Sequence, residues 1–216
     1  MGKESQLHQV LDCGIVAVVR SPDSSQLVEV VRALADGGVS VVEITLSVPN
    51  ALEVLRQVRQ ALGERVLLGA GTVLDAETAR AVLLAGAEYI VAPSLNLEVI
   101  RLCRRYDKLV MPGAFSPTEI LAAWEAGADI VKVFPADVVG PAFFAALRGP
   151  LPQIRLMPTG GVDLNTAAAF LKAGACCLGV GGHLVEPKAV ADRNFDRIRD
   201  LARQYVAIVR QVRGCP

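Results

Sequence analysis

The chain has 216 residues, of which 52% are hydrophobic, and its 22 basic residues balance 22 acidic ones. This length suits one large domain with a sizeable core, so we expect a single domain over residues 1–216. The balanced charge disfavours nucleic acid as a partner, and no apolar run reaches the roughly 18 residues that a membrane span needs.

The five cysteines, Cys13, Cys103, Cys176, Cys177 and Cys215, are odd in number and show no paired CxxC spacing. Together with an N-terminus that lacks signal-peptide architecture, they predict reduced thiols in a cytoplasmic protein. Cys176 and Cys177 are neighbours in an expected strand, so we expect their side chains on opposite faces, where they pack and cannot share a metal.

The N-terminal part alternates between helical and extended patterns. An amphipathic helix over residues 5–13 is predicted ahead of a first strand, Ile15–Val19. Ser21-Pro22-Asp23 then opens a helical pattern that closes on Gly37-Gly38. The later expected elements are strand Val41–Leu46, helix Ala51–Ala61, strand Val66–Leu68, helix Ala76–Leu84, strands Tyr89–Val91, Leu109–Met111, Ala128–Pro135 and Arg155–Met157, and a last helix over 194–212.

A short signature recurs four times along the chain: a helix closes on a glycine and the sequence runs into an apolar strand. The glycines are Gly38, Gly86, Gly127 and Gly174. With one further strand inside each interval and Ile15–Val19 at the start, the count reaches eight strands. We therefore predict a (β/α)8 barrel with a short N-terminal helix, and an open doubly wound sheet is the alternative.

Two ionisable side chains fall inside apolar strands. Lys132 is the single ammonium of Ala128–Pro135, and Glu43 is the single carboxylate of Val41–Leu46. A buried lysine without a fixed partner tends to lose its proton and become a nucleophile, and a nearby carboxylate can carry protons for it. The alternative is a buried salt bridge that only fixes the barrel.

Glycine-rich loops follow the last two expected strands. Thr159-Gly160-Gly161 and Gly179-Val180-Gly181-Gly182 expose backbone amides where barrels commonly hold a phosphate, although tight turns alone could explain them. His183 could donate to that phosphate or cap the next turn. Gly69-Ala70-Gly71 matches half of a dinucleotide fingerprint, but Leu74 replaces its third glycine, so no nicotinamide cofactor is expected.

In a barrel, active groups gather where the strands end. The residues expected there, in strand order, are Arg20, Glu43, Thr72, Pro93, Lys132, Phe134, Thr159, Gly160, Gly161, Gly181, Gly182 and His183.

With these residues assembled, the chain from Gly14 to Pro187 closely resembles the family of 2-keto-3-deoxy-6-phosphogluconate (KDPG) aldolases and 4-hydroxy-2-oxoglutarate (KHG) aldolases. Five marks carry the resemblance: Glu43-Ile44-Thr45-Leu46, Gly69-Ala70-Gly71-Thr72-Val73, Pro112-Gly113, Lys132-Val133-Phe134-Pro135 and Pro158-Thr159-Gly160-Gly161.

The resemblance implies a metal-independent class I aldolase, homotrimeric, acting on a small 2-keto acid. It implies Lys132 as the Schiff-base lysine and Glu43 as the general acid and base. It also implies a keto-acid pocket lined by Thr72, Phe134 and Thr159, and a phosphate site at Gly160, Gly161, Gly181 and Gly182.

The chain departs from the family pattern twice. Many members carry an arginine at the position of Ser47, where it contacts the substrate carboxylate, and Arg20 is the candidate to replace it. Many members have serine in place of His183, which alters the phosphate site.

The expected reaction is cleavage of KDPG to pyruvate and glyceraldehyde 3-phosphate, with KHG as a further substrate. The alternatives are the 6-phosphogalactonate epimer of KDPG as substrate, a phosphate-binding isomerase or decarboxylase without a covalent step, and a non-catalytic assembly barrel.

Overall fold

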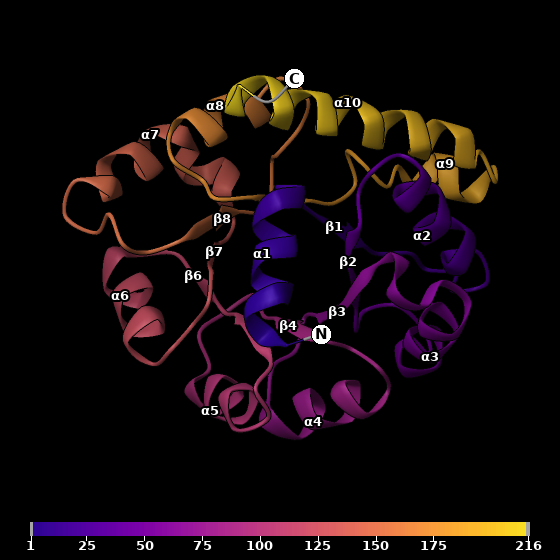
Figure 1. Cartoon of the computed structure of the whole chain (residues 1–216), viewed down its shortest axis with the longest axis horizontal. Helices are drawn as coiled ribbons and strands as arrows, with labels where there is room; N and C mark the ends of the chain where they lie inside the picture. Colours follow the sequence, from indigo (N-terminus) through magenta and orange to yellow (C-terminus); the bar gives the residue numbers. More distant parts are fainter. Residues whose placement is uncertain (1, 215–216) are drawn as a thin grey trace.

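The computed structural model describes residues 2–214, so Cys215 lies outside the described residues. Parallel strands form a ring at the centre of the molecule, with helices around it (Figure 1). The strands are β1 Ile15–Val19, β2 Val41–Thr45, β3 Leu67–Gly71, β4 Tyr89–Val91, β5 Leu109–Met111, β6 Gly113–Ala114, β7 Val131–Val133, β8 Leu156–Pro158 and β9 Leu178–Val180.

The strands form two parallel sheets that continue into one another. One has the order β5-β4-β3-β2-β1-β9 and the other β6-β7-β8. Only Pro112 separates β5 from β6, and a bridge between Thr159 and Gly179 links β8 to β9. With β5 and β6 counted as one interrupted strand, the eight strands close into the predicted (β/α)8 barrel.

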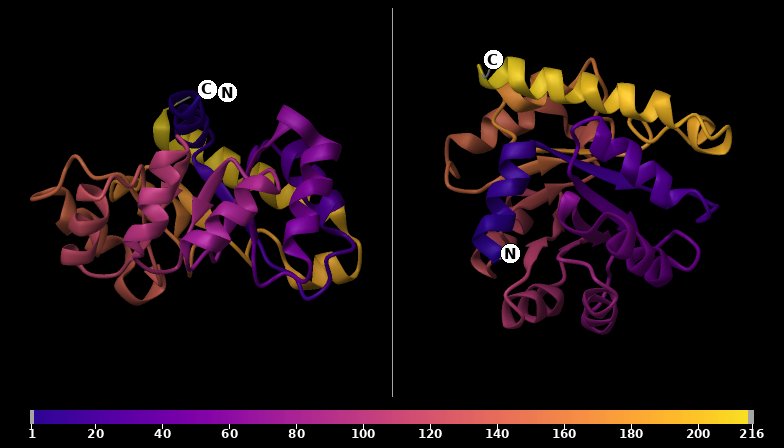
Figure 2. Two further views of the ribbon diagram at one scale, coloured as in Figure 1. Left: turned by 90° about the horizontal axis from the view of Figure 1, so that it is seen from below. Right: turned by 45° about the vertical axis from the view of Figure 1, so that its right-hand side comes forward.

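Helices cover the outside of the barrel (Figures 1 and 2). Long α10 lies across the outside and contacts α2 and α8. The helices are α1 Lys3–Cys13, α2 Leu27–Asp36, α3 Ala51–Leu62, α4 Ala76–Leu84, α5 Leu97–Arg105, α6 Pro117–Glu125, α7 Ala136–Arg148, α8 Ala167–Lys172, α9 Pro187–Ala191 and α10 Phe195–Arg213, with a 3-10 turn η1 at Gly63–Arg65.

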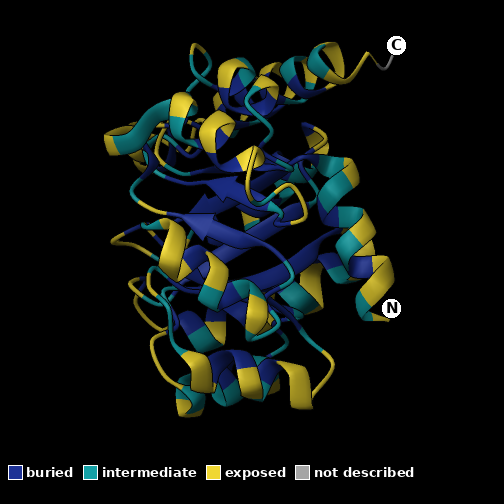
Figure 3. Ribbon diagram, turned by 90° about the vertical axis from the view of Figure 1, so that its left-hand side faces the viewer, coloured by how far each residue is buried: buried dark blue, intermediate teal, exposed yellow. Residues whose placement is uncertain are grey.

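Two apolar cores follow from the alternation of side chains along the strands. One fills the space between strands and helices; the other lies inside the barrel and contains Val16, Val41, Tyr89 and Met157. Helix α1 closes the amino-terminal end, because its Val10 packs into this inner core. The buried strands stand out from the mixed surface of the helices in Figure 3.

Three predicted boundaries were wrong by several residues. Helix α2 begins at Leu27, because the side chains of Ser21 and Asp23 accept backbone N–H bonds of 3.1 and 2.9 Å and hold the preceding residues in a turn. Strand β7 is shorter than Ala128–Pro135, and β3 runs on to Gly71 instead of ending at Leu68.

The predicted packing of the two adjacent cysteines is confirmed, because Cys177 belongs to the inner core and Cys176 packs against it, but the prediction that they point to opposite faces was wrong. Cys176 and Cys177 precede β9, so the alternation of a regular strand does not apply to them, and their sulfur atoms lie 3.8 Å apart. Within residues 2–214, no helix is both long and apolar enough to cross a bilayer.

Candidate active site

Glu43 and Lys132 enter the barrel interior from two separate strands. Both occupy the middle of their strands, β2 and β7, with side chains directed inward, and they are only 1% and 6% exposed. Burial of these two ionisable groups, which the apolar strands predicted, is therefore confirmed.

The two groups share the interior without forming an ion pair. Within residues 2–214, no salt bridge joins Lys132 to Glu43, and neither carboxylate oxygen of Glu43 has a hydrogen-bond partner. A structural salt bridge would need close contact and satisfied hydrogen bonds to offset desolvation. This geometry does not favour the purely structural alternative.

Burial shifts both groups toward their neutral forms. It raises the pKa of the Glu43 carboxyl above its ordinary value, and the charges of Lys132 and Arg20 oppose the rise. It lowers the pKa of the Lys132 amine; Glu43 opposes this change and Arg20 adds to it. A partly neutral amine is a nucleophile, and a carboxyl that exchanges its proton readily can act as general acid and base.

Phe134 lies at the carboxyl end of β7, beside the lysine. Its ring centre is 5.2 Å from Lys132 Nζ and the residue is 36% exposed, so one side of the ring remains open to solvent. The aromatic ring covers the amine on one side at this distance. The amine remains accessible from the other side.

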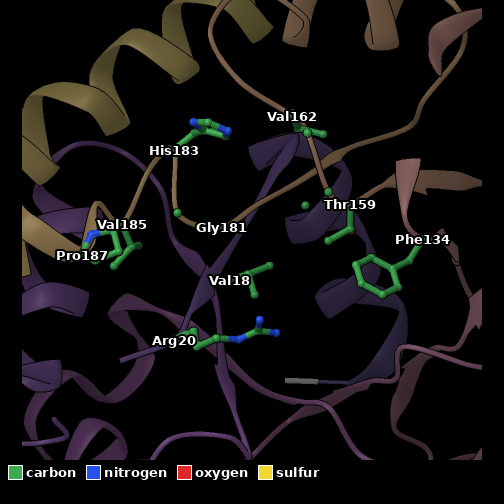
Figure 4. Close-up of a pocket in the computed structure, with 13 residues that line it drawn as sticks. Val18, Arg20, Phe134, Thr159, Val162, Gly181, His183, Val185 and Pro187 are labelled. Carbon is green, nitrogen blue, oxygen red and sulfur yellow. The ribbon is translucent and has the colours of Figure 1, made fainter. Parts of the chain in front are cut away.

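A cavity of about 420 Å³ opens at the carboxyl ends of the strands (Figure 4). The guanidinium of Arg20 projects toward its centre, and Phe134 and Thr159 lie on the opposite side. The lining residues predicted from the sequence are Arg20, Phe134, Thr159, Gly160, Gly161, Gly181, Gly182 and His183.

Arg20 is the charged group best placed to receive an anion. Its guanidinium forms no salt bridge within residues 2–214. Among the described residues, the Thr159 hydroxyl has no hydrogen-bond partner, and it is buried beside Gly179. Because the unpaired guanidinium of Arg20 projects into the cavity, the site suits a ligand with anionic oxygens.

The glycines around the cavity differ in their backbone conformation and in the space that surrounds them. Gly160 and Gly161 adopt φ angles of 91° and 68°, which other residues rarely adopt, and a Cβ on Gly161 would overlap Asp137. Gly182 has no atom within 4 Å of an added Cβ. Gly182 therefore packs against no neighbour on that side, and a side chain at this position would enter the open space of the cavity.

Four predicted residues do not line this cavity. Glu43 and Lys132 are buried in the barrel interior, and Lys132 Nζ is 5.2 Å from the ring centre of Phe134, which does line the cavity. Thr72 follows β3 with a φ of 60°, and Pro93 follows β4, where its backbone abuts Gly113. Both lie at the carboxyl end of the barrel. The sequence analysis missed the apolar lining residues Val18, Val162, Val185 and Pro187, which carry no chemical signal in a sequence.

A parallel barrel with a buried amine, a buried carboxyl and an anion-accepting cavity at the carboxyl ends of its strands has the features of a class I aldolase. Residues 7–201 match the family model described as KDPG and KHG aldolase. The chain belongs to this family and is a carbon-carbon lyase of the class I aldolase type.

Relatives in two bacteria support this assignment across most of the chain. A 2-dehydro-3-deoxy-phosphogluconate aldolase of Pseudomonas aeruginosa is 37% identical, over 88% of this chain and 86% of its own. One of Treponema pallidum is 35% identical, over 90% of this chain and 93% of its own.

A solved structure of KDPG aldolase from Legionella pneumophila is also similar. It has a TM-score of 0.85 at 26% identity and covers 93% of this chain and 98% of its own. That protein holds pyruvate captured as a covalent carbinolamine intermediate.

Proposed function

We propose that this chain cleaves 2-keto-3-deoxy-6-phosphogluconate to pyruvate and glyceraldehyde 3-phosphate, and KHG to pyruvate and glyoxylate. The observation that carries the proposal is the burial of Lys132 and Glu43 in one interior without an ion pair between them. Support also comes from the names of the relatives and from the cavity lined by Phe134, whose ring centre is 5.2 Å from Lys132 Nζ.

In the proposed mechanism, neutral Lys132 attacks the C2 ketone and forms a carbinolamine. Glu43 transfers protons during loss of water, which gives a protonated imine. Glu43, directly or through a water, then takes the proton of the C4 hydroxyl, and the C3–C4 bond breaks to release the aldehyde. The imine accepts the electron pair as an enamine, which is reprotonated and hydrolysed to pyruvate.

We assign the two anionic ends of the substrate to different parts of the cavity. Arg20 binds the carboxylate, because its guanidinium projects into the cavity and Ser47 offers only a hydroxyl. Backbone amides at Gly160, Gly161, Gly181 and Gly182 receive the phosphate, and exposed His183 donates at its edge. Thr159 and Phe134 contact the keto-acid portion, with Thr72 and Pro93 at its margin.

We also propose that the chain is one aldolase domain that works as a cytoplasmic homotrimer. The family resemblance supports this assembly, and so does an apolar groove between α6 and α7 that contains Pro117, Leu121 and Phe143. Light scattering on the purified protein tests it, since a monomer would contradict the trimer.

Pyruvate with borohydride tests the covalent step, because hydride reduces an imine to a stable adduct. We expect one modified peptide, the one with Lys132, and no adduct in Lys132→Met. Lys172→Met is the matched control, because Lys172 is an exposed lysine on α8 and its loss should leave trapping unchanged.

An adduct on Lys132→Met would refute the covalent role. Normal cleavage by this variant would show that Lys132 is dispensable. A parent protein that traps no adduct but isomerises or decarboxylates a phosphorylated substrate would favour the non-covalent alternative, and absence of all turnover in the parent would favour an assembly barrel. A panel with KDPG, its galactonate epimer and KHG identifies the substrate.

A further inference from the structure

The two glycines of Gly69-Ala70-Gly71 each lie against a side chain from a neighbouring strand. A Cβ on Gly71 would overlap the carboxylate of Glu43, which comes from β2. A Cβ on Gly69 would overlap the ring of Tyr89, which comes from β4. The carboxylate of β2 and the phenol of β4 therefore lie over two successive inward positions of β3, Gly71 and Gly69.

The strand register places these groups in one row. Glu43 pairs with Gly69, and Gly69 pairs with Tyr89, so the three residues lie side by side across β2, β3 and β4. The ring atoms nearest to Gly69 are Cζ and its two neighbours, at the hydroxyl end of the phenol. Tyr89 thus reaches across β3 toward the strand that carries Glu43.

Both groups are buried, and neither has a hydrogen-bond partner among residues 2–214. Tyr89 is 0% exposed and Glu43 is 1% exposed, and within this range neither the phenol oxygen nor either carboxylate oxygen forms a hydrogen bond. Buried polar groups without any partner are rare and costly, and a bridging water is their usual partner. One water between them would give the phenol and the carboxylate each a hydrogen-bond partner.

Other polar groups near the phenol already have partners. The thiol of Cys13 donates to the carbonyl of Ile15 at 3.3 Å, and the sulfur of Cys177 lies 3.8 Å from that of Cys176. Burial raises the pKa of Tyr89, and the charge of Glu43 is the largest further contribution, ahead of Cys13 and Cys177. Glu43 is therefore the group to which the phenol is coupled most strongly.

We propose that Tyr89 is a positioning residue for Glu43, whose carboxylate receives the phenol's hydrogen bond through a shared buried water at the floor of the site. This inference rests on the proposed role of Glu43 as proton carrier. Donation toward the carboxylate favours its ionised form, so loss of the hydroxyl should make Glu43 harder to ionise. The other charged groups that face Glu43 are Lys132 and Arg20, and both stay in place.

The test replaces Tyr89 by Phe, which removes only the hydroxyl. The acid-side midpoint of kcat/KM should move to higher pH, with about a threefold loss of kcat/KM below the midpoint and little change above it. Tyr205→Phe is the matched control: Tyr205 is also fully buried, its hydroxyl also lacks a partner, and it faces Asp163 and Glu186 instead of Glu43.

A second readout does not depend on turnover. The carboxyl of Glu43 can be titrated by NMR in protein with 13C-labelled glutamate, with Glu43→Gln to assign its signal. Tyr89→Phe should move this titration upward and Tyr205→Phe should not. An unmoved Glu43 titration in Tyr89→Phe, or an equal shift in Tyr205→Phe, would overturn the inference. A shifted titration with an unchanged kcat/KM profile would support the link and count against Glu43 as proton carrier.

Discussion

The carboxylate of Glu43 occupies the space beside Gly71 that a side chain there would fill, since an added β-carbon would overlap Oε1. Gly71 ends β3 and Glu43 is in the middle of β2, so the glycine leaves the space into which the neighbouring carboxylate leans. The orientation of Glu43 therefore depends on the absence of a side chain at Gly71.

Gly71→Ala should displace the Glu43 carboxylate and lower kcat by about 100-fold, the usual contribution of a general acid or base. Binding of pyruvate should change far less. Gly149→Ala is the control, because the nearest atom to an added Cβ there is 3.7 Å away and its φ of −61° suits alanine. Steady-state kinetics and a pyruvate binding isotherm measure both effects, and wild-type kcat in Gly71→Ala would show that the orientation of Glu43 is unimportant.

Burial of Glu43 and Lys132 should reduce stability in opposite pH ranges. The folded chain holds the Glu43 proton more tightly than the unfolded chain, so the free energy of unfolding falls as pH rises above about 4.5. Lys132 has a lowered pKa when folded, so the unfolded chain binds more protons below about 10.5 and the free energy of unfolding rises with pH there.

Glu43→Gln should therefore stabilise the protein more at pH 8 than at pH 5, and Lys132→Met more at pH 6 than at pH 9. Each gain should be about 1 kcal/mol, or about 2–4 °C in Tm for a chain of this size. Thermal unfolding at these pH values measures it. Equal gains in the free energy of unfolding at both pH values, or losses, would show that burial does not shift the pKa of either group toward its neutral form.

The sequence predicted the barrel because a helix that closes on a glycine before an apolar strand recurs four times, with one further apolar strand inside each interval and another at the start. It predicted that Glu43 and Lys132 are buried, because each is the single ionisable residue of an apolar strand core. It did not predict what Gly69 and Gly71 support, because that depends on strand register, which places Glu43, Gly69 and Tyr89 in one row. For the same reason, the sequence did not predict that the hydroxyl of Tyr89 is buried on the side of β3 that faces Glu43.

Arg20 should influence the lysine as well as the substrate. Burial is the main cause that lowers the pKa of Lys132, and the charge of Arg20 lowers it further. Arg20→Met should thus move the pH midpoint of borohydride trapping upward, when rates are extrapolated to saturating pyruvate so that weaker binding is separated out. Arg193→Met is the control, because this exposed arginine borders the neighbouring cavity together with Arg20. A midpoint that moves equally in both variants, or in neither, would contradict this role.

Gly182 offers the cleanest test of where the substrate phosphate binds. Gly161 cannot serve, because its φ of 68° and its contact with Asp137 make any replacement strained. Gly182 lines the cavity, yet no atom lies within 4 Å of an added Cβ, so Gly182→Val should fold normally and only fill the space.

If the phosphate binds at these amides, Gly182→Val should lower kcat/KM for KDPG by about tenfold, the effect of losing a charge-assisted hydrogen bond or two. The value for KHG, which has no phosphate, should change less than about twofold, because its C1 carboxylate would still bind Arg20 and its ketone would still react with Lys132. Pyruvate release coupled to lactate dehydrogenase measures both, with Gly149→Val as a control for a valine placed outside the cavity. Equal losses for the two substrates would place the phosphate elsewhere, and an unchanged KDPG value would do the same.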